Sequence, residues 1–283
     1  ADGTEAVWSL EAQDVNSLGR RGIDGSLINV GDTVRVAGNV SMRRSNNMSI
    51  SNLLLANGTE LKVRGNPEPR WSNEDNIGFN QPTVEDALSV AGEGEGLFRV
   101  WMSARRGGFP AQLPLTPAAR AAQVNWDAAT DDLTMQCITS GMPAAMRLSP
   151  PHPIDLTEQG DNIVFRAELF DIVRTIHMNP QANAAEQSAS ALGYSAGRWE
   201  GGTLVIETTR VNWGFFDHLG SIPISEDIAM TERLTVSDDG NQMVYELTVS
   251  DSTTFTEPVT GRWTMNWRPD LVVEPYVCVA EGD

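Results

Sequence analysis

Short segments of alternating apolar and polar residues, separated by turn residues, are the feature that most limits how this chain folds. Beyond Asp132 the alternation runs through 154–158, 162–170, 172–178, 229–237 and 242–250. A period of two residues is typical of strands that bury one face. The last two segments flank Asp238-Asp239-Gly240-Asn241, whose residues tolerate left-handed backbone, so they predict a hairpin.

Further strand segments follow the same rhythm, at 198–200, 203–211, 255–267 and 272–279. About eight to ten antiparallel strands at this spacing are typical of a closed barrel or a sandwich. Residues 97–283 are therefore predicted to form a large antiparallel β-domain, a calycin-like barrel or a sandwich. One short helix is expected at about 116–126, because Thr116-Pro117 places an N-cap ahead of a first-turn proline.

Residues 1–65 are predicted to form a separate, smaller β-domain. Asp32 to Val40 alternates cleanly, and Asn57-Gly58 supplies a turn before the chain returns over 60–63. Residues 66–96 are rich in Pro, Asn, Gly and acidic residues without a sustained period, which is linker composition. Because this segment also contains Trp71, Ile77 and Phe79, we expect it to fold back onto the small domain.

Charge and cysteine content narrow the classes of partner. The chain has 38 acidic and 20 basic residues, a net charge of -18, which repels nucleic-acid phosphates. No run of about 18 apolar residues occurs, so neither membrane insertion nor a nucleic-acid partner is expected. Cys137 and Cys278 are the two cysteines and lack C-x-x-C spacing, which favours a structural disulfide over metal or redox chemistry.

Several long motifs give the chain a resemblance to a known family. They are RVW at 99–101, PLTPAARAA at 114–122, CITSGMP at 137–143, FDIVRTIHM at 170–178, GRWEGGTLVIETT at 197–209, Glu232-Arg233, FTEP at 255–258 and YVC at 276–278. In these motifs residues 97–283 resemble a largely uncharacterised family of exported bacterial β-proteins. Residues 7–63 resemble the later half of a small OB-like domain that often precedes it, including GDTVRV at 31–36.

The resemblance implies a signal-directed protein of the periplasm or the extracellular space, in which Cys137 and Cys278 are joined. It also implies that the OB-like domain lacks its earlier strands, because the chain begins inside the family pattern. An incomplete sheet exposes an edge, so a homo-oligomer formed through this domain is one expectation. Tyr194 stands at a position where the family usually has His, and Ile224, just before Ser225, stands where it often has another. A site built on those two histidines is therefore not expected here.

The strand at 172–178 carries two candidate site residues. Arg174 and His177 lie at odd separation, so alternation sends them to opposite faces unless a bulge intervenes. If Val173 faces the core, Thr175 and His177 do too. His177 would then be a general acid or base inside the domain, because imidazole titrates near neutral pH. The structural alternative is a histidine that is satisfied by a backbone carbonyl.

Carboxylates beside bases and aromatic residues supply the other candidates. Glu200 follows Trp199, and Glu232 precedes Arg233, so each is a structural ion pair or a proton carrier. Asp217 and His218 follow an aromatic run and are candidates for a ligand pocket. We name His177, Glu200, Asp217 and Glu232 as candidate catalytic residues. The candidate ligand-binding residues are Arg174, His177, Trp199, Trp213, Phe216 and His218.

Three classes of function stay open. The first is an exported β-barrel that binds a small ligand, with a pocket that includes the 179–196 loop. The second is a cofactor-independent lyase, isomerase or hydrolase that uses His177 with a carboxylate, and the third is a structural subunit of a surface or extracellular assembly. No cofactor is expected. A metal is not expected either, because His152, His177 and His218 lack the close spacing of a ligand set.

Overall fold

Thr83 and Val84 mark the border between two units of the fold, Ala1–Thr83 and Val84–Asp283. The computed structural model describes residues 5–42, 44–90, 94–105, 107–127, 130–148, 150–179, 184–276 and 278. The border falls inside the segment 66–96 that the sequence predicts as a linker or a fold-back segment.

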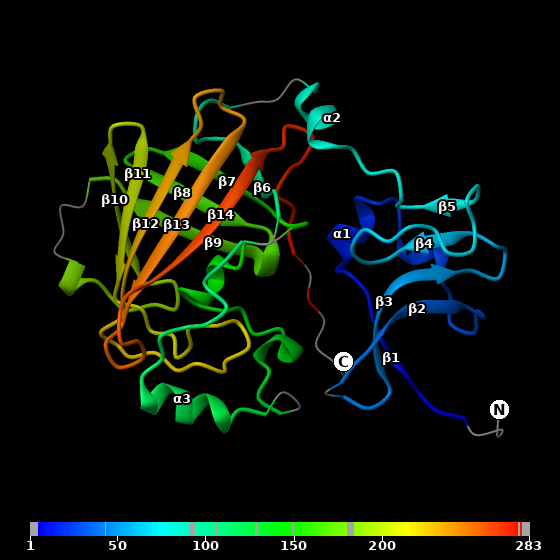
Figure 1. The fold of residues 1–283 in the computed structure, drawn as a ribbon. Coiled ribbons are helices and arrows are strands. Elements are labelled where there is room, and N and C mark those ends of the chain that lie inside the picture. Colours follow the sequence, from blue (N-terminus) through cyan, green and yellow to red (C-terminus); the bar gives the residue numbers. More distant parts are fainter. Residues whose placement is uncertain are drawn as a thin grey trace. The chain divides into compact units, whose positions relative to one another are not determined.

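Nine strands of the described chain close into a barrel in the second unit (Figure 1). The strands are β6 (Val100–Ser103), β7 (Pro153–Gln159), β8 (Asn162–Ala167), β9 (Ile172–His177), β10 (Tyr194–Glu200), β11 (Thr203–Thr209), β12 (Ala229–Val236), β13 (Gln242–Ser250) and β14 (Val259–Trp267). Each strand pairs with its neighbours in sequence, and β14 pairs with β6. The all-β prediction is confirmed, and the domain is a barrel and not a sandwich.

An odd number of strands explains the one irregular joint of the barrel. Directions can alternate all around a closed ring only if the strand number is even, so nine strands require a parallel pair. That pair is β9 and β10, with Ser195 opposite Ile176 and Ala196 opposite His177. A parallel pair needs a long crossover. The 178–193 connection therefore has a topological reason, and the barrel departs from the purely antiparallel prediction.

The interior of the barrel is filled by side chains at alternate positions. On β13, Met243, Tyr245, Leu247 and Val249 are fully buried, and their neighbours on the strand are more exposed. β12 alternates in the same way, whereas on β11 Val205 is buried together with its neighbours Leu204 and Ile206. Interior alternation of this kind is how small barrels build a core.

Three α-helices occur in the described residues: α1 (Val15–Gly19), α2 (Val84–Leu88) and α3 (Pro117–Val124). The predicted helix is α3, whose N-cap Thr116 accepts a hydrogen bond from the Ala119 N–H. The other two have five residues each, too few for a periodic pattern in the sequence to predict them. Short 3₁₀ turns lie at Gly25–Leu27, Leu133–Gln136, Ala144–Met146, Leu169–Asp171 and Ala184–Glu186.

The predicted final strand at 272–279 is wrong for residues 272–276 and 278, which form no strand; residues 277 and 279 lie outside the described part. The ninth barrel strand is β6 instead. Pro275 has no N–H to donate to a ladder. The Glu274 N–H donates to the buried carboxylate of Glu168, and the Tyr276 ring packs 5.4 Å from Phe170, so this segment lies against the barrel as a tail.

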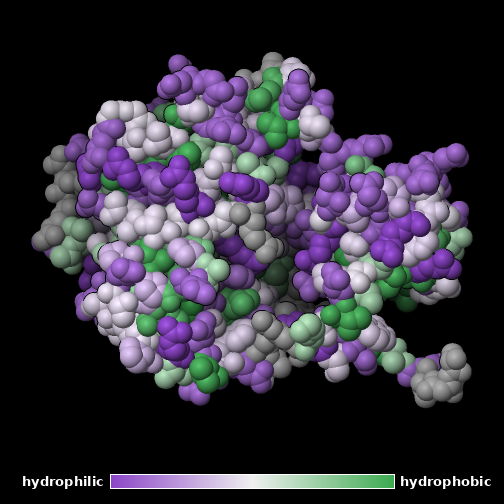
Figure 2. Space-filling model, in the orientation of Figure 1, coloured by the Kyte–Doolittle hydropathy of each residue, from purple (hydrophilic) through white to green (hydrophobic). Residues whose placement is uncertain are grey.

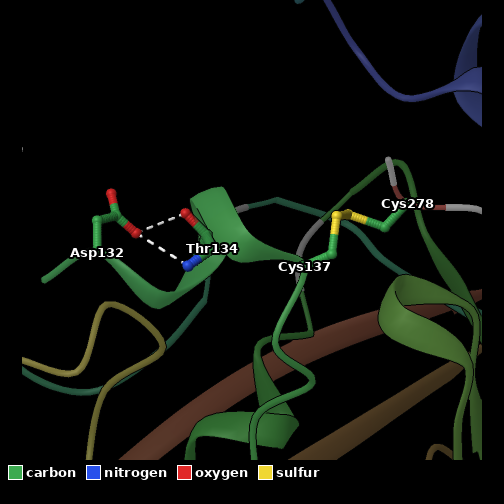
Figure 3. Close-up of a disulfide and its surroundings, with 4 residues drawn as sticks. All are labelled: Asp132, Thr134, Cys137 and Cys278. Atoms are coloured by element: carbon green, nitrogen blue, oxygen red, sulfur yellow. Dashed lines mark hydrogen bonds between the residues drawn. A yellow bond between two sulfur atoms is a disulfide. The ribbon is translucent and has the colours of Figure 1, made fainter. Parts of the chain in front are cut away.

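A disulfide joins Cys137 to Cys278 and anchors the tail (Figure 3). The Cα atoms of the two cysteines are 5.8 Å apart, and 141 residues separate them in sequence. Cys137 follows the turn Leu133–Gln136, which Asp132 caps by accepting hydrogen bonds from the Thr134 backbone N–H and hydroxyl. The predicted disulfide is confirmed.

The first unit is built on an open five-stranded sheet. Its strands are β1 (Ser9–Glu11), β2 (Arg35–Val40), β3 (Asn47–Leu54), β4 (Glu60–Lys62) and β5 (Asn76–Ile77). β3 pairs with β1, β2 and β4. Ile23, Ile50, Leu53, Leu61 and Val63 form the core beneath the sheet. In the described residues β2 pairs with β3 alone, so its second edge has no strand.

Residues 66–79 fold onto the first unit, on the side of β4. Both oxygens of the buried Glu60 carboxylate accept backbone N–H groups, at 2.8 Å from Arg70, 2.7 Å from Trp71 and 2.9 Å from Ser72. β5 then pairs with β4, and Ile77 packs on the core. These residues fold back onto the small domain, as the sequence predicts, and they pair with β4 and not with the second edge of β2.

The surface in Figure 2 is mostly polar, with scattered hydrophobic side chains. In the described part of the chain, every helix falls short of the length and hydrophobicity of a membrane span.

Candidate functional site

A buried ion pair lies inside the barrel. The guanidinium of Arg174 donates to both carboxylate oxygens of Glu232, at 2.6 and 3.0 Å, and the two residues are 3% and 1% exposed. The Tyr245 hydroxyl donates to Glu232 at 2.9 Å, and the Thr208 hydroxyl donates at 3.1 Å. Ser195 accepts from Arg174 Nε at 3.0 Å. Every charged atom of the pair therefore has partners, which buried charges require.

The position of Arg174 reverses the predicted face of β9. Val173 is 52% exposed, and the inward residues are Ile172, Arg174 and Ile176. His177 therefore lies outside the barrel interior. The alternating pattern of β9 allows either of its faces to point inward, because both carry apolar residues. The face with Arg174 points inward because the Glu232 carboxylate lies inside the barrel and pairs with it.

The pair also shifts pKa values around it. Burial lowers the pKa of Arg174, but the negative charge of Glu232 outweighs burial and raises the pKa above its ordinary value. The pKa of Tyr245 is raised well above its ordinary value, first by burial and then by the same carboxylate. Arg174 thus stays a cation and Tyr245 a neutral donor, which suits a structural network.

A cavity of about 460 Å³ opens at the end of the barrel where β11 and β13 finish, which we call the loop end. Three connections that meet there supply the lining, together with one residue of β14. The lining residues are Gly107, Gly108, Phe109, Pro143, Ala144, Met146, Arg147, Leu148, Phe216, Asp217, His218 and Trp263. Most of them are apolar, as in pockets for small molecules.

Three aromatic rings form the wall of the cavity. Phe109 lies 4.6 Å from Phe216 and 5.7 Å from Trp263 between ring centroids. Gly107 allows the loop to approach β14, because a Cβ atom there would lie 2.7 Å from the Arg262 carbonyl and from the Trp263 ring. The adjacent Gly108 pairs with Arg262 through backbone hydrogen bonds. The glycine pair thus places Phe109 against the other two rings.

Met146 separates the cavity from the buried ion pair. Its side chain lines the cavity, and its sulfur lies 3.8 Å from Arg174 Nη1. Met142 contacts the same nitrogen at 3.6 Å and is fully buried. The charge network therefore supports the floor of the cavity without lining it.

Asp217 shapes the loop that carries two other lining residues. Its carboxylate accepts hydrogen bonds from the backbone N–H groups of Leu219, Ser221 and Ile222 and from the Ser221 hydroxyl. Both oxygens are thus occupied by the loop, and Asp217 acts as a turn organiser.

His218 and Arg147 form the polar side of the cavity. Both also line a smaller neighbouring pocket, together with Ala144. Burial lowers the pKa of His218 to about 4, and the positive charge of Arg147 adds to this effect. Asp217 and Asp132 act in the opposite direction. The imidazole is therefore neutral at pH 7, whereas the guanidinium of Arg147 is charged and exposed.

The structure brings three of the predicted site residues together: Phe216, Asp217 and His218 line one cavity. It separates the others. His177 Nδ1 lies 3.1 Å from Asn162 Oδ1, and the imidazole stacks on the Tyr194 ring, with centroids 4.8 Å apart. Glu200 is exposed and binds Arg198 and Arg233. His177 and Glu200 thus lie outside the cavity, whereas Glu232 is buried beneath it.

Of the predicted aromatic site residues, Phe216 lines the cavity and the two tryptophans do not. Trp199 is 46% exposed and meets Phe98 edge-on at the opposite end of β10. Trp213 packs on Gly141 and does not line the cavity. Of the 179–196 loop, residues 180–183 lie outside the described part. The Ala191 carbonyl accepts the Met142 N–H, so the described remainder supports the lining from behind.

Most of the lining could not be predicted from the sequence, because it lies on irregular connections that have no periodic pattern of apolar residues. Two signals were available. The Gly107-Gly108 pair marks a close backbone approach, and alternation along β14 turns Trp263 inward with Gly261 and Met265. Within the described residues, no group of three His, Cys, Asp or Glu side chains is placed to hold a metal ion. No family model and no curated protein matches the chain.

Proposed function

We propose that this protein is an exported small-ligand-binding β-barrel that holds its ligand in the cavity at the loop end. The single observation that carries the proposal is the cavity itself, about 460 Å³ in volume with a wall of Phe109, Phe216 and Trp263. A disulfide supports export, because such bonds persist in oxidising compartments. The motifs that resemble exported bacterial β-proteins point the same way.

A neutral fluorescent probe tests the cavity. N-phenyl-1-naphthylamine fluoresces when it enters an apolar site, and we expect saturable one-to-one binding to the whole protein. Ala144→Leu places extra bulk in the lining, so it should weaken binding at least about fivefold, since overpacking displaces the ligand. Ala118→Leu adds the same bulk on the exposed face of α3 and should leave binding unchanged.

Folding of each variant is checked by circular dichroism and thermal melting. If Ala144→Leu does not fold, Phe109→Ala replaces it, because Phe109 is only partly buried and forms one side of the wall. Probe binding that is absent, or equal in the cavity variants and in Ala118→Leu, rejects the proposal.

Catalysis at the same cavity is the second candidate, and the neutral imidazole of His218 favours it. A neutral imidazole can accept a proton from a bound substrate. A lyase, isomerase or hydrolase reaction would then use His218 in place of His177. His218→Gln should abolish turnover of a bound compound and leave its affinity within about twofold; turnover that persists in this variant excludes His218 as the base.

A further inference from the structure

Resting on the proposed function, we infer that the ligand is a flat apolar molecule that carries one anionic group, and that Arg147 binds this group. The aromatic wall would hold the body of the ligand. The guanidinium at the polar side of the cavity would hold a carboxylate or a sulfonate. An aromatic carboxylic acid has this chemistry.

The shape of the wall supports a flat body. Phe109 and Phe216 are tilted by 57° at 4.6 Å, and Phe109 meets Trp263 edge-on at 87°. Rings in these orientations present both faces and edges, which a planar aromatic ligand contacts well. Met146 lies beside them, and a thioether makes favourable contacts with aromatic rings.

Among the described residues that line the cavity, Arg147 is the cationic side chain. A guanidinium carries five N–H donors, so it can hold an existing partner and still bind a carboxylate through two parallel hydrogen bonds. Because Arg147 is exposed, the anionic group of the ligand keeps part of its hydration. Binding would then avoid most of the desolvation cost of a fully buried ion pair.

The acidic side chains near the cavity do not favour a cationic ligand instead. Both oxygens of Asp217 already accept hydrogen bonds from the 219–222 loop. Asp132 accepts from the backbone N–H and the hydroxyl of Thr134. At Asp217 a cationic ligand would therefore meet a carboxylate whose two oxygens already accept hydrogen bonds.

The imidazole of His218 lies within the influence of the charges at this side of the cavity. Next to burial, Arg147 has the largest effect on its imidazole, ahead of Asp217 and Asp132, which have the opposite sign. The charge of Arg147 therefore acts at this side of the cavity, although two carboxylates oppose it and the whole chain carries a net charge of -18. The overall charge repels anions, so any preference for an anionic ligand must come from this local arrangement.

Two probes that differ by one anionic group test the inference. 1-Anilinonaphthalene-8-sulfonate is N-phenyl-1-naphthylamine with an added sulfonate. We expect the sulfonate probe to bind the whole protein more tightly than the neutral probe. Arg147→Gln should weaken sulfonate binding about tenfold or more, the range of a charge-assisted hydrogen bond, and leave neutral binding within about twofold. Arg147→Lys should restore part of the loss.

Arg198→Gln is the matched control, because Arg198 is an exposed arginine at the opposite end of β10 and should change neither affinity. Displacement of the neutral probe by 1-naphthoate, but not by 1-naphthamide, extends the test to carboxylates. Equal affinity for both probes, or equal losses in Arg147→Gln, overturns the inference and leaves the cavity proposal standing. Binding of neither probe overturns both.

Discussion

Arg174 and Glu232 hold opposite charges in the interior of a barrel whose other inward residues are mostly apolar. The ion pair is worth little in net stability, because burial of both charges is costly, but removal of one partner leaves an unpaired charge. Glu232→Gln should therefore reduce the free energy of unfolding by about 3 to 5 kcal/mol, measured by urea denaturation.

Glu246→Gln is the control for this prediction. Glu246 pairs with Arg262 on the surface at 2.6 Å, and such a pair contributes at most about 1 kcal/mol. A loss in Glu232→Gln no larger than in Glu246→Gln would show that Arg174 finds water or another partner inside the barrel.

His218 makes stability depend on pH. Its pKa is about 4 in the folded chain, below the ordinary 6.5, so the unfolded chain takes up a proton that the folded chain does not. Stability is unaffected above pH 6.5 and falls as pH decreases from 6.5 to 4. The free energy of unfolding, measured between pH 7 and pH 4, should decline less in His218→Gln than in the natural chain. Parallel curves for the two proteins contradict the prediction.

Residue positions could be predicted from the sequence where one face of a strand is clearly apolar. The inward face of β13 is such a case, since Met243, Tyr245, Leu247 and Val249 alternate with polar or less buried neighbours. β9 is not, because isoleucine and valine occupy both of its faces. The partner that settles its orientation, Glu232, lies 58 residues further along the chain. Local pattern does not contain such a long-range contact.

At the scale of elements, the disulfide holds a tail that has no strand pairing of its own in the described residues. Cys278→Ser should reduce the free energy of unfolding by about 3 to 5 kcal/mol, because the bond closes a very long loop. Cys137→Ser and the double variant should show the same loss, since all three changes remove one bond. Losses that add in the double variant would mean that each cysteine also contributes by packing.

The segment after β4 depends on one carboxylate. Burial raises the pKa of Glu60, but the backbone N–H groups of Arg70, Trp71 and Ser72 outweigh this and lower it, so Glu60 is ionised. In Glu60→Gln an amide NH₂ replaces one acceptor oxygen and faces N–H donors. Trypsin should then cut after Arg70 at least about tenfold faster, as judged by mass spectrometry, because local opening governs cleavage.

Glu74→Gln is the control for the trypsin experiment, because Glu74 lies in the same segment but is exposed. Rapid cutting after Arg70 in the natural chain would mean that the segment opens despite Glu60. The second edge of β2 is a separate matter, and oligomerisation through that edge stays a prediction.

Elements with local signals could be predicted, and those defined by partners could not. Thr116-Pro117 predicted α3, and the turn residues at 238–241 predicted the hairpin of β12 and β13. The segment 272–279 contains apolar residues that suit a strand. However, β6 already lies between β14 and β7, so neither of these strands has a free edge with which the segment could pair. β6 is short, and its pattern is too brief to show a period.

For the molecule as a whole, the all-β class follows from strand spacing, whereas the position of the site does not. The cavity lies where connections 107–109, 143–148 and 216–218 meet, and the closed ring of strands brings them together. The ring closes through the parallel pairing of β9 with β10, and a parallel pair is required because the number of strands is odd. If the segment 272–279 took the place of β6 in the ring, as the sequence predicts, other loops would meet at the loop end.

β6 gives the molecule a mechanical property. It is the first barrel strand after the border at Thr83, and its ladder is short: Val100–Met102 pairs with β7 and Trp101–Ser103 pairs with β14. Tension that draws the two units apart therefore reaches the barrel at one of its most weakly paired strands. Once β6 detaches, the ring becomes an open curved sheet with two unpaired edges, and the Gly107–Phe109 side of the cavity is then held to β14 by the backbone pairing of Gly108 with Arg262.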